Sequence, residues 1–139
     1  MNFLLDTTVV SEWMQPAPNS GVIRWLSEVD EDRVFLSVIT LAELRFGTER
    51  LASGTRKSRL ETWLREELPL RFEGRLLIIE AAIADTWGRL VSRCSAVRRP
   101  IGVMDAFFAA TAEVHALTLV TRNVSDFTAS GIPLLNPWS

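Results

Sequence analysis

Cysteine and histidine each occur only once in the 139-residue chain, as Cys94 and His115. A single cysteine excludes an intrachain disulfide framework and a cysteine-based metal site. A single histidine excludes a multi-histidine metal centre and gives little support to a histidine-dependent catalytic triad. Cys94 lies in an apolar helical pattern and is expected as a buried core thiol, and His115 is expected at the end of a helix.

Other signals are also missing from the chain. No glycine pattern of a P-loop or a dinucleotide-binding turn is present, and no apolar run approaches the length of a membrane span. The chain opens on a strand-like segment without a basic leader or cleavage site, so a cytoplasmic protein is expected. With 47% hydrophobic and 23% charged residues, residues 1–139 are predicted to form one globular domain.

Lysine is scarce as well, since Lys57 is the only lysine among fifteen basic residues. The net charge of -2 does not indicate a general surface for polyanions. Eight of the basic residues nevertheless fall between Arg45 and Arg75. Arginine suits phosphates and carboxylates, so this stretch could hold nucleic acid or an acidic protein, although a solvated helix face is the commoner explanation.

Short apolar segments alternate with helical patterns along the chain. Strands are expected at 2–5, 34–36, 76–79 and 117–121, with a short edge strand at 133–135. Helices are expected at 7–14, 20–29, 38–52, 56–68, 80–97 and 105–115, and Pro69 is expected to end the fourth of them. This alternation predicts an α/β fold with a central parallel β-sheet flanked by helices.

Four acidic residues are the main clue to function: Asp6, Glu43, Asp105 and Asp126. Asp6 follows the first predicted strand and Asp126 follows the fourth, so both are expected at the sheet edge where open parallel sheets bind ligands. Glu43 and Asp105 lie in apolar helical stretches, and the neighbours of Glu43 predict a largely buried helix. Carboxylates in such surroundings are costly without a cation. A site of oxygen ligands favours Mg²⁺ or Mn²⁺ over zinc.

Each acid also has a simpler explanation. Asp6 and Asp105 fit helix N-caps, Asp126 fits a helix start, and Glu43 could pair with a distant arginine. Three polar residues nearby suit the orientation of ligands or water, although turn and capping roles are common for their types: Thr7, Thr121 and Asn123.

Four segments carry these acids in order over almost the whole chain: Phe3–Glu12, Ser37–Gly47, Asp105–Ala112 and Val120–Phe127. In these segments the chain resembles the PIN-domain ribonucleases, and most closely the VapC-type toxins of VapBC toxin–antitoxin pairs. The resemblance implies a single PIN domain, Mg²⁺-dependent cleavage of RNA phosphodiester bonds and inhibition of translation. It also implies a homodimer that is neutralised by a cognate antitoxin.

The resemblance also assigns roles to the acids. Asp6 and Asp105 would be the principal metal ligands, and Glu43 would complete the acidic cluster. Family members place the fourth carboxylate at the position of Asn123 or of Asp126. Position 123 is an amide here, so Asp126 is assigned. Thr8 stands where asparagine is frequent, and an orienting hydrogen bond is expected to be weaker there.

Substrate and partner surfaces can be proposed at the same level. RNA phosphates are expected to approach the acids past Arg98, Arg99 and Arg122, with an ordinary surface cluster as the alternative. Trp63 and Trp87 fit apolar helical stripes in the core or an interface, and none of the five tryptophans is assigned to RNA. The helices around 44–68 are expected to form the hydrophobic groove for an antitoxin segment, as the family resemblance implies.

Three other classes of protein compete with this interpretation. A phospho-accepting receiver domain needs paired acids after the first strand and a lysine after a late one, but Thr7 follows Asp6 and Lys57 lies in mid-chain. A haloacid-dehalogenase-like phosphatase needs an aspartate where Thr8 stands. A non-catalytic PIN-like module that binds RNA or protein remains open, although four acids are an electrostatic disadvantage for binding RNA.

Overall fold

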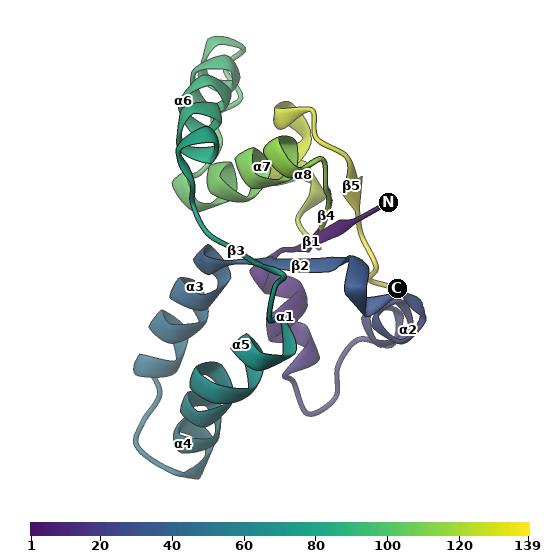
Figure 1. Cartoon of the computed structure of the whole chain (residues 1–139), viewed down its shortest axis with the longest axis vertical. Coiled ribbons are helices and arrows are strands. Elements are labelled where there is room, and N and C mark those ends of the chain that lie inside the picture. The colour runs from purple at the N-terminus through teal and green to yellow at the C-terminus, as the bar shows by residue number, and fades with distance from the viewer.

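The computed structural model describes all residues from Met1 to Ser139 and consists of a parallel sheet between two layers of helices (Figure 1). The five strands are β1 (Phe3–Leu5), β2 (Val34–Ser37), β3 (Leu76–Leu77), β4 (Thr118–Val120) and β5 (Leu134–Leu135). They lie in the order β3-β2-β1-β4-β5, and every neighbouring pair is parallel. The predicted α/β class and the short fifth strand are therefore confirmed.

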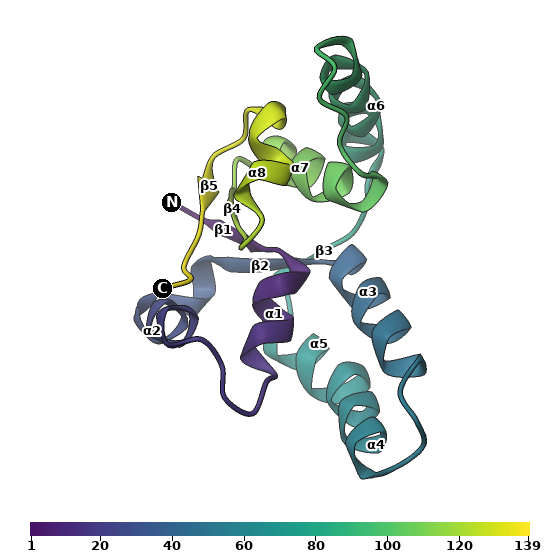
Figure 2. The ribbon, with the colours of Figure 1, turned by 180° about the vertical axis from the view of Figure 1, so that it is seen from behind.

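The helices cover the two faces of the sheet unequally (Figures 1 and 2). One layer holds α1 (Thr7–Trp13), α2 (Ser20–Glu28), α3 (Val38–Glu49), α4 (Thr55–Thr62) and α5 (Leu68–Arg71). The other layer holds α6 (Ala81–Ala96), α7 (Val103–His115) and α8 (Val124–Phe127). Short 3-10 turns occur at Glu31–Arg33 and Thr128–Ser130. None of the helices combines the length and the apolar character that a membrane crossing requires.

Successive strand residues point to opposite faces, and this alternation builds two hydrophobic cores. Leu4 of β1 and Leu119 of β4 pack into the cluster under α6, α7 and α8, which also contains Cys94. Their neighbours Leu5 and Val120 pack into the cluster on the α1 and α2 side. Cys94 is fully buried, as predicted.

The helical region after α3 differs from the prediction. Pro69 does not end the helix, because the chain stays helical through Pro69 to Arg71. A π-helical turn at Trp63–Glu67 precedes it, and the N–H of Leu68 donates to the carbonyl of Trp63, five residues back. A proline ring clashes with the carbonyl four residues earlier in a regular α-helix. The wider π turn gives the ring room.

The predicted strand 76–79 is shorter in the structure. Only Leu76 and Leu77 pair with β2, and the next side chain, Ile78, is 67% exposed. The strand ends there because the chain leaves the sheet toward α6.

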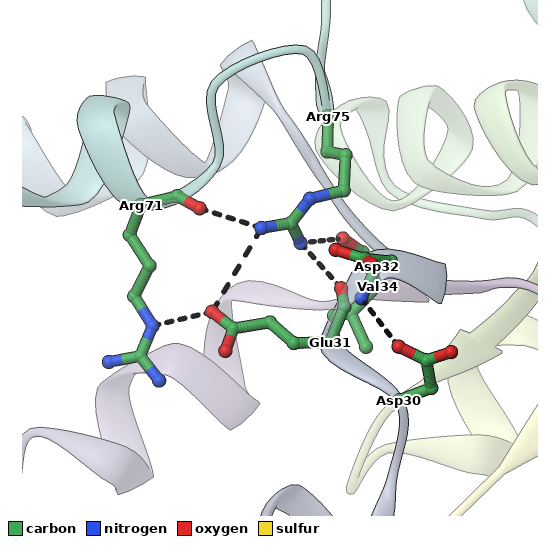
Figure 3. Close-up of polar contacts among 6 residues, drawn as sticks. All are labelled: Asp30, Glu31, Asp32, Val34, Arg71 and Arg75. Carbon is green, nitrogen blue, oxygen red and sulfur yellow. Dashed lines mark hydrogen bonds and ion pairs between the residues drawn. The ribbon is translucent and has the colours of Figure 1, made fainter.

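Arg75 fastens this edge of the sheet to the helix that precedes it (Figure 3). Its Nη1 donates to the carbonyls of Glu31 and Val34, each at 2.6 Å. Its Nη2 donates to the carbonyl of Arg71 at the end of α5, also at 2.6 Å. Arg71 in turn donates from Nε to Glu31 Oε1 at 2.7 Å. One guanidinium thus binds three backbone carbonyls from three places in the chain, and it holds β3 beside β2.

The Arg75→Met variant is expected to lose about 2 kcal/mol of unfolding free energy, because hydrogen bonds from a charged donor to partly buried carbonyls are lost. The Arg75 side chain is only 15% exposed. Arg65→Met is the matched control, because that side chain is 62% exposed and has one weak ion pair. Urea unfolding of both variants checks this, and equal losses would contradict the role given to Arg75.

Candidate active site

The strand order places a topological switch point between β1 and β4. The chain passes from β1 to β2 on one side and from β4 to β5 on the other. In open parallel sheets, ligands bind beyond the carboxyl ends of the strands at such a point. Asp6 directly follows β1 and Thr121 directly follows β4, and the N–H of Asp6 donates to the carbonyl of Val120 at 2.9 Å.

The structure brings all four candidate acids to one polar cleft of about 510 Å³. Asp6 comes from the junction of β1 and α1, Glu43 from α3, Asp105 from the first turn of α7 and Asp126 from α8. Asp6 is only 5% exposed, Glu43 and Asp105 are half-buried, and Asp126 is exposed. Residues that are up to 120 positions apart in sequence thus share one solvent-accessible hollow.

The carboxylate of Asp6 is held by two hydroxyl groups. Its Oδ2 accepts hydrogen bonds from Thr121 Oγ1 at 2.7 Å and from Thr8 Oγ1 at 2.9 Å. Thr121 Oγ1 also accepts the N–H of Asn123 at 3.0 Å. Asp6 stands at the N-cap position of α1, but its side chain makes no capping hydrogen bond. The side chain is therefore oriented toward the site by threonines, and Thr8 supplies an orienting bond where a weaker one was expected.

Glu43 is oriented by a second threonine pair. Thr7 Oγ1 donates to Glu43 Oε1 at 2.6 Å and lies 3.1 Å from Thr40 Oγ1. Because the single hydroxyl proton of Thr7 goes to the carboxylate, Thr40 is the donor in the second contact. This chain of hydroxyls ties α1 to α3 and sets the position of Glu43.

The prediction that Glu43 sits in a largely buried helix is wrong. Glu43 and Leu44 are only half-buried, Ala42 is exposed, and Phe46 is 64% exposed. The apolar residues of α3 are distributed around the helix. Ile39, Leu41 and Leu44 pack against the cores, and Leu44 also lines a surface groove.

The electrostatics of the cleft follow from this crowding. Burial raises the pKa of Asp6, and the hydrogen bonds from Thr121 and Thr8 oppose that rise. Burial also raises the pKa of Asp105 to about 6, and the charges of Asp6, Asp126 and Glu43 add to the effect. The charge of each of the other three carboxylates therefore disfavours ionisation of Asp105.

None of the four carboxylates forms an ion pair with an arginine, lysine or histidine. The negative charge of the cleft is therefore not balanced by a side-chain ion pair, which fits a divalent cation with oxygen ligands. No three acidic, cysteine or histidine side chains lie close enough together in this structure to hold a metal ion by themselves. Mg²⁺ keeps several water ligands in protein sites, so carboxylates spaced around an open cleft suit it.

The three arginines proposed for RNA lie at different distances from the acids. Arg122 lines the acidic cleft together with Asn123. Arg99 lines an adjoining hollow that also touches Asp105 and Asp126. Arg98 is exposed and lines neither hollow, and its backbone has a φ of 58°. The structure thus brings two of the three to the acids.

Several cleft residues were not identified from the sequence: Ser11, Glu12, Gln15 and Trp138. Ser11 and Glu12 share a face of α1 with Thr8, at helical spacings of three and four residues, and this pattern could have identified them; Gln15 follows the helix. Trp138 follows β5, and nothing in its local sequence connects it with the acids. Trp63 and Trp87 pack against the two cores, in agreement with the prediction.

A second hollow opens from the acidic cleft. An apolar groove of about 680 Å³ runs between α1, α3 and α4, and it is lined by Leu44, Leu51, Leu60, Trp63 and others. Thr7, Ser11, Gln15 and Glu43 line both the groove and the cleft. The two hollows therefore adjoin one another.

This fold, with acids gathered at its switch point, is that of a PIN domain. A family model described as PIN domain matches residues 3–128, and the chain belongs to this family. Among its members, the chain is similar to Toxin FitB of Neisseria gonorrhoeae, with 37% identity over 135 residues and 97% coverage of both chains. It is also similar to VapC ribonuclease Y4jK of Sinorhizobium fredii, with 33% identity and coverage of 97% and 96%.

Solved structures agree with this placement. The crystal structure of FitAcB from Neisseria gonorrhoeae contains a chain with a TM-score of 0.93 and 37% identity, with 98% of each chain covered. The structure of FitAB bound to an IR36 DNA fragment gives a TM-score of 0.93 at 34% identity, covering 99% of this chain and 96% of that one. The predicted resemblance to VapC-type PIN-domain toxins is confirmed.

Proposed function

We propose that this protein is the ribonuclease toxin of a toxin–antitoxin pair and hydrolyses RNA phosphodiester bonds with Mg²⁺, or with Mn²⁺ in its place. The observation that carries the proposal is the acidic cleft, in which four carboxylates meet without an ion pair and burial and repulsion raise the pKa of Asp105 to about 6. The similarity to a VapC ribonuclease and to Toxin FitB supports it. Cleavage of RNA in the cytoplasm would inhibit translation.

The roles of the acids follow from their surroundings. Asp6 and Asp105 are the two metal ligands, flanked by Glu43 and Asp126. A cation held there would activate a water molecule and stabilise negative charge on the phosphate. The threonine hydroxyls keep Asp6 and Glu43 in fixed orientations, so little reorganisation is needed at the moment of reaction. Glu43 and Asp126 remain to accept a proton from the attacking water.

RNA is drawn to this acidic hollow by arginines on its rim. Arg122 and Arg99 border the acids, and Arg98 adds charge beside Arg99. Guanidinium groups bind phosphate oxygens in a fork geometry. They attract the RNA backbone, and a metal held by Asp6 and Asp105 would screen the carboxylates from the scissile phosphate.

The apolar groove between α1, α3 and α4 is the proposed site of the antitoxin. Because the groove adjoins the acidic cleft, one antitoxin segment would fill the groove and extend an arginine toward the carboxylates. That arginine would neutralise the site in place of the metal. Homodimerisation is proposed as well, and the exposed apolar side chains Val97, Val103 and Met104 support the α6–α7 junction as the proposed surface.

The test is cleavage of a mixed set of structured and single-stranded RNAs by protein purified free of antitoxin. Cleavage is expected in Mg²⁺ and is expected to fall to background in EDTA, because without a cation the carboxylates repel the phosphate and nothing lowers the pKa of the attacking water. The Asp105→Asn protein, purified in parallel, controls for contaminating nucleases. Cleavage that survives both EDTA and the substitution is due to a contaminant. Absence of cleavage together with absence of metal binding would instead support a non-catalytic binding module.

A further inference from the structure

The segment after β5 brings Trp138 to the acidic cleft. β5 pairs with β4, and the N–H of Thr121 donates to the carbonyl of Leu135 at 2.9 Å. Because the two strands are parallel, the chain leaves β5 at the edge of the sheet where Asp6 and Thr121 lie. The following residues, Asn136–Ser139, therefore run along that edge, and Trp138 lines the cleft.

This segment is fixed against the start of α2. Asn19 accepts the N–H of Ser139 on Oδ1 at 3.2 Å and donates from Nδ2 to the Ser139 carbonyl at 3.1 Å. Gly21 lies so close that a Cβ there would stand 2.4 Å from the carbonyl oxygen of Pro137. The N–H of Trp138 donates to Asn136 Oδ1 at 3.0 Å. Trp138 is thus held from both sides at one position of the rim.

Trp138 contacts Arg122, an arginine that forms no ion pair within the protein. The guanidinium carbon of Arg122 lies 5.7 Å from the centre of the Trp138 ring, within the range of a cation–π contact. Arg122 faces the acidic cleft but forms no ion pair with its carboxylates. One half-buried aromatic ring and one guanidinium without an ion pair therefore lie together beside the acids.

We propose that Trp138 and Arg122 form a nucleotide-binding platform, in which Arg122 binds a phosphate next to the scissile one and Trp138 stacks on the base of that nucleotide. The inference rests on the ribonuclease function proposed above. Tryptophan offers a flat face to any base, and a guanidinium suits the adjoining phosphate. Because only an unpaired base can reach such a ring, the platform selects single-stranded RNA or a loop at the cleavage site.

The bland alternative is that Trp138 only covers the core, since its ring also packs against the α1 and α2 cluster. Variants that differ in aromaticity separate the two roles. Trp138→Leu keeps an apolar side chain but cannot stack, whereas Trp138→Phe keeps a smaller stacking face. If Trp138 only covers the core, removal of a base affects both variants to the same extent. If Trp138 stacks on a base, only Trp138→Phe keeps its sensitivity to that removal.

The experiment measures kcat/KM in Mg²⁺ on a short single-stranded RNA and on copies in which one nucleotide near the cleavage site lacks its base. For the wild type, removal of one particular base is expected to lower kcat/KM about 10-fold, as expected for the loss of one stacked base. Trp138→Leu should lower it about 10-fold on intact RNA and show no further loss on the abasic RNA. Trp138→Phe should retain most of the wild-type sensitivity. Thermal unfolding of each variant verifies that it is folded.

Three outcomes are distinguishable. If Trp138→Leu cleaves intact RNA as the wild type does, or loses a further 10-fold on abasic RNA, the platform is wrong while the ribonuclease stands. If the wild type cleaves no RNA in Mg²⁺, the proposed function fails, and the platform is then judged by anisotropy of labelled RNA without metal. In that case equal affinity of the wild type and Trp138→Leu overturns the platform as well.

Arg122→Gln should reduce the salt dependence of RNA binding by about one phosphate contact, and an unchanged dependence contradicts its role.

Discussion

The Asp105→Asn variant is expected to lose at least about 1,000-fold in kcat for RNA cleavage while becoming more stable than the wild type in EDTA. The loss of activity follows from removal of a metal ligand, because a bound cation contributes several kcal/mol to the transition state and each 1.36 kcal/mol is tenfold in rate. The gain in stability follows from the raised pKa of Asp105, which shows that its charge is unfavourable in the folded protein. Asparagine has the same shape and no charge.

The gain is expected to be modest because Asp105 is only half-buried. A relief of about 1 kcal/mol corresponds to a rise of about 3 °C in the midpoint of thermal unfolding for a domain of this size. Asp85→Asn is the matched control, since that aspartate is 65% exposed and paired with Arg89 on α6. The control should change neither activity nor midpoint. A variant that keeps wild-type cleavage, or that unfolds earlier than wild type in EDTA, would sink the assignment of Asp105.

Magnesium is expected to reverse the pH dependence of stability. In EDTA, the folded protein holds the proton of Asp105 more tightly than the unfolded chain does, since the pKa rises from 3.8 to about 6 on folding. The associated stability is therefore fully present below pH 3.8 and is lost as the pH rises through about 6. Solvent screening reduces the loss to about 1 kcal/mol. The raised pKa of Asp6 acts in the same direction.

Bound Mg²⁺ requires ionised carboxylates, so its affinity increases over the same pH range. At 100 times its dissociation constant the ion adds about 2.7 kcal/mol of stability, or about 8 °C in the unfolding midpoint. Thermal unfolding at several pH values between 5 and 8, with EDTA or with MgCl₂ and matched NaCl, measures both effects. A midpoint that does not respond to Mg²⁺, or that rises as much in Asp105→Asn as in the wild type, would contradict a metal site at these acids.

Local sequence was enough to predict the α/β class, because apolar strand segments alternate with helical periods and each signal lies within a few residues. The four acids could be selected in the same way. Asp6 and Asp126 follow strands whose carboxyl ends must share an edge, and the ordered segments around them resemble a known family. The PIN family and the VapC-type likeness were predictable for this reason.

Where the prediction failed, a non-local contact was decisive. Pro69 was predicted to end a helix, but a π-helical turn that packs against the core accommodates its ring. The apolar neighbours of Glu43 predict a buried face, but only Leu41 and Leu44 pack against the core, and Leu44 also lines an open groove. The apolar pattern of a sequence indicates which residues avoid water. It does not distinguish a face buried in the core from an apolar surface that a partner covers.

The sequence by itself determined which groups are available for the chemistry of this protein: a set of four acids in an α/β fold, with one histidine and one cysteine as the only alternatives of those types. Only the tertiary structure decided how that set is held. The threonines that orient Asp6 and Glu43, and the segment that brings Trp138 and Arg122 to the rim, join residues that are far apart in the chain. Strand order and helix packing create these contacts, and neither is encoded in any single short segment.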